Sequence, residues 1–110
     1  MAKGDYLGEF EQIILLALLR LRDNAYGMTV RREILNRTGR EVSIGAVYAT
    51  LERLEQKGYV SSRQGEPTLE RGGRAKRFFK IDADGATALK ESQTQLSKMA
   101  HGLKPQLEAL

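Results

Sequence analysis

The residues best suited to chemistry are basic side chains gathered in one short segment. Between Arg71 and Lys80 the chain has five basic residues and no acid: Arg71, Arg74, Lys76, Arg77 and Lys80. Guanidinium and ammonium groups at this density attract anions, and the phosphates of nucleic acid are the commonest such partner. A charged run by itself is more often a solvated loop, so its interpretation depends on the elements around it.

The charge of the whole chain is concentrated around this segment. Residues 1–30 carry three basic and four acidic side chains, and residues 81–110 carry the same counts. Residues 31–80 carry twelve basic and six acidic side chains, so all of the excess positive charge lies in the middle of the chain. This distribution indicates an anionic partner.

A helix with both ends marked precedes the basic segment, over residues 42–58. Ser43 is a good N-cap, because its hydroxyl can accept a backbone N–H of the first turn, and Gly58 suits the left-handed position that follows a helix. Apolar residues recur at the helical period and predict one buried stripe: Ile44, Val47, Leu51 and Leu54.

The opposite face of this helix is small, hydroxylated or basic, and no acid appears before Glu52. A helix that enters a major groove with its N-terminal half needs little bulk and no negative charge there. Six residues are therefore expected to approach bases and flanking phosphates: Ser43, Gly45, Tyr48, Ala49, Thr50 and Arg53. Two alternatives remain open, namely an ordinary amphipathic helix with an idle solvent face, and pairing of Arg53 with Glu52 or Glu55.

Two more helices are expected before this one. Asp5 can cap a helix over residues 6–22, and a second helix follows over residues 26–38 until Gly39 ends it. The inward residues of the second helix are predicted to be Val30, Ile34 and Leu35. Two helices joined by a short glycine-containing turn form a helix-turn-helix, although a helical hairpin that packs for its own sake is the alternative.

The pattern changes from helix to strand after Gly58. Residues 59–63 and 75–81 favour extended structure, and the glycines and Pro67 between them indicate a hairpin loop. A basic hairpin directly behind a helix-turn-helix is typical of the wing of a winged-helix domain, whose loop lies against the DNA backbone or minor groove. The wing contacts are expected from Arg71, Arg74, Lys76 and Arg77.

A last helix capped by Asp82 carries an apolar seam at alternate spacings of three and four residues. Its members are Ala86, Leu89, Gln93, Leu96, Ala100, Leu103, Leu107 and Leu110. Such a heptad seam can dock on its own domain, but its length favours pairing with another chain. Gly102 and Pro105 are expected to bend or break this helix.

The first helix also indicates a partner subunit, because it is apolar on more than one side. Ile13, Leu15, Leu16 and Leu19 lie outside its expected core stripe, and a domain this small does not easily surround such a helix alone. The predicted dimer interface therefore combines residues of the first and last helices: Ile13, Leu16, Leu89, Leu96, Leu103 and Leu107.

The composition argues against several other classes of protein. There is no cysteine, so neither a disulfide framework nor a thiolate zinc site is expected. The longest apolar run, residues 13–19, is far shorter than the roughly 20 residues of a membrane span. With no signal-peptide pattern, a cytoplasmic protein without a membrane partner is the expectation.

An enzyme is not expected either. The lone histidine, His101, has no accompanying nucleophile or metal-ligand cluster in the sequence, and Gly72–Gly73 lacks the strand-to-helix context of a phosphate-binding loop. No catalytic residue, metal ligand or cofactor is therefore predicted.

Taken in order, these motifs resemble the PadR family of bacterial transcriptional regulators over nearly the whole chain. The resemblance is carried by Tyr26–Gly27, by residues 43–55 with Gly58 and Val60 after them, and by residues 72–79 with Ile81 and Gly85. Two positions depart from the family pattern: Asp82 stands where threonine is usual, and Phe79 where many members have tyrosine. Asp still caps a helix and Phe still packs, so the expected fold is unchanged.

The resemblance implies a mainly α protein with a small β-hairpin. Residues 1–82 would form a winged helix-turn-helix domain whose first helix is shared with the dimer interface, and residues 83–110 a C-terminal dimerisation helix. A homodimeric repressor is implied, with a palindromic operator in double-stranded DNA as its expected partner, and members of the family often respond to small hydrophobic or aromatic molecules. The surplus apolar surface of the first helix, together with this analogy, predicts that such an effector would bind between the first and last helices. The alternative is a winged-helix module that binds only proteins, against which the basic wing argues.

Overall fold

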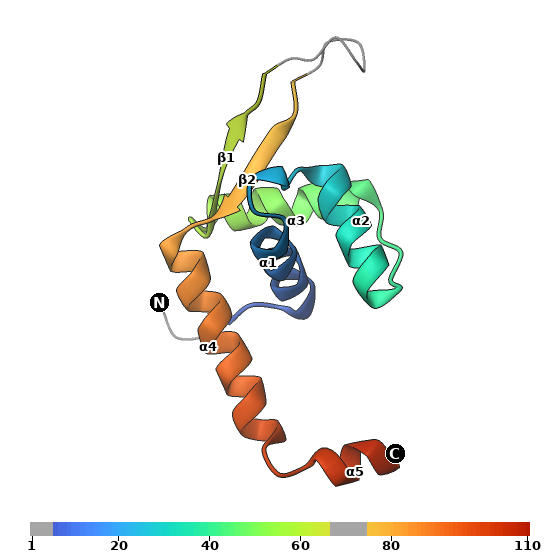
Figure 1. The fold of residues 1–110 in the computed structure, drawn as a ribbon. Helices are drawn as coiled ribbons and strands as arrows, with labels where there is room; N and C mark the ends of the chain where they lie inside the picture. Colours follow the sequence, from blue (N-terminus) through green and yellow to red (C-terminus); the bar gives the residue numbers. More distant parts are fainter. Residues whose placement is uncertain (1–5, 67–74) are drawn as a thin grey trace.

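Helix α1 (Glu9–Leu21) lies at the centre of the computed structural model, which describes residues 6–66 and 75–110 (Figure 1). A short 3-10 helix, η1 (Arg22–Asn24), leads to α2 (Gly27–Thr38) and α3 (Ile44–Gln56). The strands β1 (Val60–Gln64) and β2 (Arg77–Ile81) follow, and α4 (Ala83–Ala100) and α5 (Lys104–Ala109) end the chain. The fold is mainly helical with one two-stranded antiparallel hairpin, as predicted.

The start of α1 differs from the prediction of a helix beginning at residue 6 under an Asp5 cap. Asp5 lies outside the described residues, and the N-cap position is Gly8. The Glu11 carboxylate accepts a hydrogen bond from the Gly8 N–H at 2.9 Å, which satisfies a backbone donor at the helix start. Leu7 lies before the helix, and its N–H donates to the Ser92 hydroxyl of α4 at 3.1 Å.

The core forms where α1 meets the inward faces of α2 and α3. Its largest fully buried side chains are those of Ile14, Leu15, Val30, Val47, Leu51, Leu54 and Val60, the last from β1. Leu15 therefore belongs to the core of the chain itself, not to a surplus apolar surface as predicted. Leu35, which was expected to point inward, is instead 39% exposed at the outer side of α2.

The hairpin packs one face on this core and leaves the other outside. Ser62 pairs with Phe79 in the antiparallel register, and the Phe79 ring is buried as its alternation with Phe78 and Lys80 predicts. The Phe79 N–H donates to the Ala25 carbonyl at 2.8 Å, so the chain before α2 continues the sheet beyond β2. The wing strands are therefore fixed to the start of α2 as well as to each other.

Helix α4 begins against α1 and then leaves the rest of the fold (Figure 1). Ala88, Leu89 and Ser92 are buried in its first half, so this half belongs to the same packed unit as the residues before position 82. Asp82 occupies the N-cap position as predicted, but its carboxylate turns to the Ser61 hydroxyl at 2.8 Å and does not cap the helix.

The expected break after α4 is confirmed. Gly102 has a φ of +80°, which favours glycine, and Pro105 lies in the first turn of the separate helix α5, where its missing N–H costs nothing. Across the two segments that the structure describes, no helix has the length and apolar character needed to cross a membrane.

Candidate nucleic-acid interface

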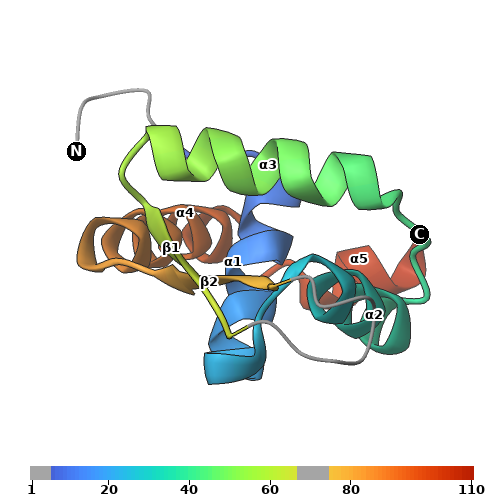
Figure 2. The same cartoon turned by 90° about the horizontal axis from the view of Figure 1, so that it is seen from above.

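Helix α3 runs along one side of the molecule beside the hairpin, as the view from above shows (Figure 2). The Ser43 hydroxyl accepts the Ala46 N–H at 3.0 Å and so acts as the predicted N-cap. Gly58 has a φ of +79°, the left-handed conformation expected after the last turn. Both ends of α3 are therefore defined by the residues that the sequence indicated.

The exposed face of α3 is small over its first two turns. Gly45, Ala46 and Ala49 are exposed, and the acid Glu52 appears on this face only in the third turn. Together Gly45, Ala46 and Ala49 are called the reading face below. Such a surface brings the helix backbone close to an incoming partner without steric or charge opposition.

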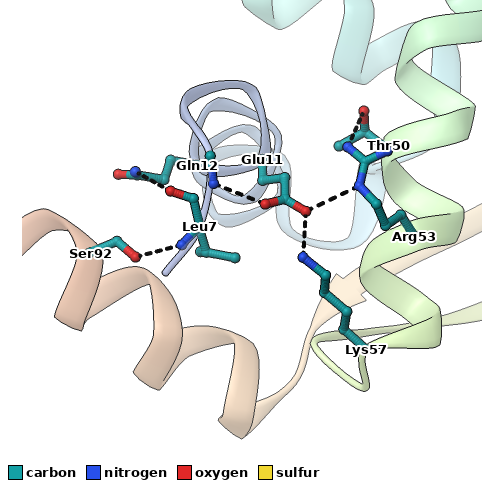
Figure 3. A network of polar contacts seen from close by, with 8 residues as sticks. Leu7, Glu11, Gln12, Thr50, Arg53, Lys57 and Ser92 are labelled. Atoms are coloured by element: carbon teal, nitrogen blue, oxygen red, sulfur yellow. Dashed lines mark hydrogen bonds and ion pairs between the residues drawn. The ribbon is translucent and has the colours of Figure 1, made fainter. Parts of the chain in front are cut away.

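Two of the residues expected to approach DNA are placed differently. Thr50 is only 3% exposed and lies on the side of α3 toward α1 (Figure 3), so it is not part of the exposed surface expected to approach DNA. Tyr48 is half-buried, and its ring lies over Gly27 at the start of α2, where an added Cβ would overlap with the ring. Tyr48 joins the two helices of the helix-turn-helix.

Arg53 lies at the end of α3 in an ion pair that the sequence pattern did not suggest (Figure 3). Within the described residues its Nε donates to Glu11 Oε2 at 3.2 Å, and the pairing considered with Glu52 or Glu55 is absent. Lys57 Nζ donates to the same oxygen of Glu11 at 3.0 Å. One carboxylate of α1 thus binds both cations at the C-terminal end of α3.

The carboxyl group of Glu11 is buried yet ionised. Burial raises its pKa, but the hydrogen bond from the Gly8 N–H and those from Lys57 and Arg53 outweigh this effect, so the net pKa lies below the ordinary value of 4.5. Sequence reasoning missed this residue because Glu11 stands 42 positions before Arg53 and no local spacing links them.

The wing residues fall into two groups. Arg71 and Arg74 lie outside the described residues. Lys76 Nζ lies 4.5 Å from the centroid of the Tyr26 ring and within 3.4 Å of its hydroxyl. Arg77, at the start of β2, forms an ion pair with Glu55 of α3 and donates to the Ser62 hydroxyl at 3.0 Å.

A row of two aromatic rings and two cations, which the sequence pattern did not suggest, lies on the outer side of the hairpin. The Arg63 guanidinium lies 4.7 Å from the Phe78 ring centroid, and the Phe78 and Tyr26 rings meet edge to face at 5.5 Å. Lys76, whose Nζ lies over the Tyr26 ring, completes the row. Phe78 pairs with Arg63 across the strands, a relation that becomes visible only once the register is known.

The predicted interface residues of α1 and α4 divide by burial. Leu89 is buried in the core of its own chain, so it is not available on the surface for a partner as predicted. Leu16, Leu96, Leu103 and Leu107 are exposed and Ile13 is half-buried. Gln93, the polar member of the seam, donates to the Gln12 amide of α1 at 2.6 Å, an internal contact.

A helix-turn-helix with a small exposed face on its second helix, followed by a two-stranded wing, defines a winged-helix DNA-binding protein. The chain belongs to the PadR-like family of transcriptional regulators, whose sequence profile matches residues 15–91. It is therefore a DNA-binding transcriptional regulator and not an enzyme. A comparison with curated protein sequences gives no match.

Solved structures of PadR family regulators have the same fold. One from Bacillus cereus superposes with a TM-score of 0.71 at 18% identity, over 89% of this chain and 90% of the other. One from Clostridium difficile gives 0.69 at 17% identity, over 89% and 98%. One from Eggerthella lenta gives 0.68 at 22% identity, over 93% and 88%.

Proposed function

We propose that this protein is a homodimeric repressor that binds a palindromic operator in double-stranded DNA and releases it when a small hydrophobic or aromatic effector binds. Residues 1–82 provide the DNA-binding domain, and residues 83–110 provide most of the dimer contacts together with α1. The observation that carries the proposal is the reading face of α3, which is small and exposed, on a helix that lies beside the wing strands (Figure 2).

The contacts with DNA would be of two kinds: contacts that read the base sequence and contacts that position the protein on the phosphate backbone. Gly45 and Ala49 would bring the α3 backbone close to base edges in the major groove, and Ser43 would present the free N–H groups of the helix start to a phosphate. Arg71, Arg74 and Lys76 would hold the backbone of the duplex through charge alone, and so carry no sequence information.

The proposal of a dimer is supported by apolar side chains that are exposed to solvent in the single chain. Leu96 is 57% and Met99 76% exposed on the outer half of α4, and Leu16 and Leu19 are 38% and 48% exposed on α1. Apolar side chains gathered on two neighbouring helices are typical of a subunit interface. A second copy of the chain is the partner proposed for them, with α4 as the main contact.

The support for an effector is a cavity of about 370 Å³ between α1 and α4. Ile13, Leu16 and Leu96 supply apolar walls, and Gln12, Ser92 and Gln93 supply groups that form hydrogen bonds. Its volume falls within the range of about 300–1,000 Å³ that is usual for small-molecule sites. Because exposed interface residues line it, a molecule bound there would alter how two subunits meet.

Selection of bound sequences from random duplex DNA by the purified protein tests the proposal. A recovered palindrome with two equal half-sites is the expected result, since a two-fold dimer places two α3 helices about one helical turn apart. Recovery of no preferred sequence, with retention independent of salt, would instead favour a winged-helix domain that binds only proteins.

A further inference from the structure

The feature from which we infer a further role is the ion triad of Glu11, Arg53 and Lys57 (Figure 3). Arg53 lies eight residues after Gly45 and four after Ala49, so its Cα belongs to the same side of α3 as the reading face. Lys57 follows one turn later, as the C-cap of the helix. Both side chains nevertheless turn back to α1, where Glu11 binds them.

The Glu11 carboxylate is well suited to hold these cations. It is only 7% exposed, and its other oxygen accepts the Gly8 N–H, which fixes the orientation of the group. The Arg53 and Lys57 side chains are each roughly half exposed, so only the Glu11 end of each pair is removed from solvent. A phosphate would have to compete with a buried, already oriented anion for either cation.

We propose that Glu11 is a specificity-determining residue, which withholds Arg53 and Lys57 from DNA phosphates and thereby limits non-specific binding. Cations attract every DNA sequence equally, so two more of them on α3 would strengthen binding in any register. The two cations would add less affinity to the operator complex. In that complex the base contacts fix the N-terminal half of α3 in the groove, and Arg53 and Lys57 lie at the other end of the helix. The inference rests on the proposed docking of the reading face against DNA.

Glu11→Gln tests this role, since it removes the charge while the side chain keeps its shape and one acceptor. Non-specific affinity is measured on a random-sequence duplex over a series of KCl concentrations. We expect tighter binding and a steeper plot of log K against log salt concentration. The slope should increase by about one to two units per bound chain, close to 0.9 for each side chain, Arg53 or Lys57, that is freed from Glu11 and contacts a phosphate. A residue that only supports the fold gives the opposite result, which is weaker binding with an unchanged or shallower slope.

Glu91→Gln provides the matched control, because it makes the same change of charge at an exposed position of α4. Its salt slope should equal that of the unaltered chain. In a Glu11→Gln background, Arg53→Gln should remove about one unit of the added slope. If the double variant keeps the full increase, Arg53 is not the cation that Glu11 withholds, and the proposal is overturned.

Arg53→Gln alone keeps the test independent of how well Glu11→Gln folds. With Glu11 intact, Arg53 already contributes no phosphate contact, so the salt slope should change by less than about half a unit. A slope flatter by about one unit means that Arg53 contacts phosphate and overturns the inference. If the unaltered chain binds no DNA at any salt concentration, both the proposed function and the role of Glu11 are excluded. If the unaltered chain binds DNA but Glu11→Gln has the same salt slope, only the role of Glu11 is excluded.

Discussion

The ring of Tyr48 in α3 occupies the space that a side chain on Gly27 of α2 would need. The Tyr-Gly pair at the start of α2 therefore has a packing role in setting the angle between the two helices of the helix-turn-helix. Gly27→Ala should force the outer edge of the Tyr48 ring to swing away. The expected cost is about 1 kcal/mol of unfolding free energy, at the low end of overpacking, because the ring can move.

Gly45→Ala is the matched control for this substitution. An added Cβ at Gly45 meets only the Ser43 hydroxyl, at an ordinary contact distance of 4.0 Å, so the higher helix propensity of alanine should stabilise the fold by roughly 0.5–1 kcal/mol. Chemical denaturation of the two variants gives both values. If Gly27→Ala is as stable as Gly45→Ala, the Tyr48 contact does not constrain the helix pair.

The dimer proposal makes a direct prediction at Leu96. Leu96→Glu places a charge in the exposed apolar surface of α4, which should separate the subunits or greatly raise the dissociation constant. Light scattering across a dilution series measures this. Thr94→Glu, at an exposed position of the same helix, should leave the dimer intact. A stable Leu96→Glu dimer would place the interface elsewhere.

Arg74 and Arg77 of the wing were given the same role in the sequence analysis, and the contacts of Arg77 allow a sharper prediction. Arg77 already binds Glu55 and Ser62, and Arg74 lies outside the described residues. Arg74→Ala should flatten the salt slope of DNA binding by about one unit and weaken all sequences alike. Arg77→Ala should flatten it by less, because its guanidinium is shared with a carboxylate. Equal slopes for both would show that the Glu55 pair opens when DNA binds.

The lowered pKa of Glu11 predicts a pH dependence of stability. A carboxyl group whose folded-state pKa lies below its ordinary 4.5 stabilises the fold above that value and loses the contribution as the pH falls through the folded-state pKa. The gap in Tm between the unaltered chain and Glu11→Gln should therefore be largest near neutral pH and shrink below about pH 4.5. Thermal unfolding at pH 7 and pH 3 measures it. A gap that stays constant would mean that the charge of Glu11 does not stabilise the fold.

Local patterns in the sequence were enough to predict most of the framework. The caps Ser43 and Gly58, the break at Gly102 and Pro105 and the alternation around Phe79 depend on neighbours within a few residues, and each is confirmed. The helix-turn-helix and the hairpin follow from the order of these signals.

The parts that the sequence did not predict depend on contacts between distant segments. Periodicity placed Thr50 on the outer face, but α1 packs against that side of α3 and buries it. Leu89 was read as part of a continuous seam, yet it is buried where the first half of α4 packs against α1, whereas Leu96 in the second half is exposed. The Glu11 triad joins residues 42 and 46 positions apart, which no helical or strand spacing reveals.

The central claim is that the small exposed side of α3 reads DNA, and Ala49→Gln tests it most directly. Ala49 is exposed and glutamine is a good helix former, so the Tm should change little. Affinity for the operator recovered by selection should fall by about 1–3 kcal/mol, the scale of one disturbed base contact, while affinity for random DNA stays the same. The measurement is a titration of the operator duplex and of the random-sequence duplex with this variant. A fall in operator affinity alone is the predicted result, and an unchanged operator affinity would contradict the claim that α3 reads DNA with this side.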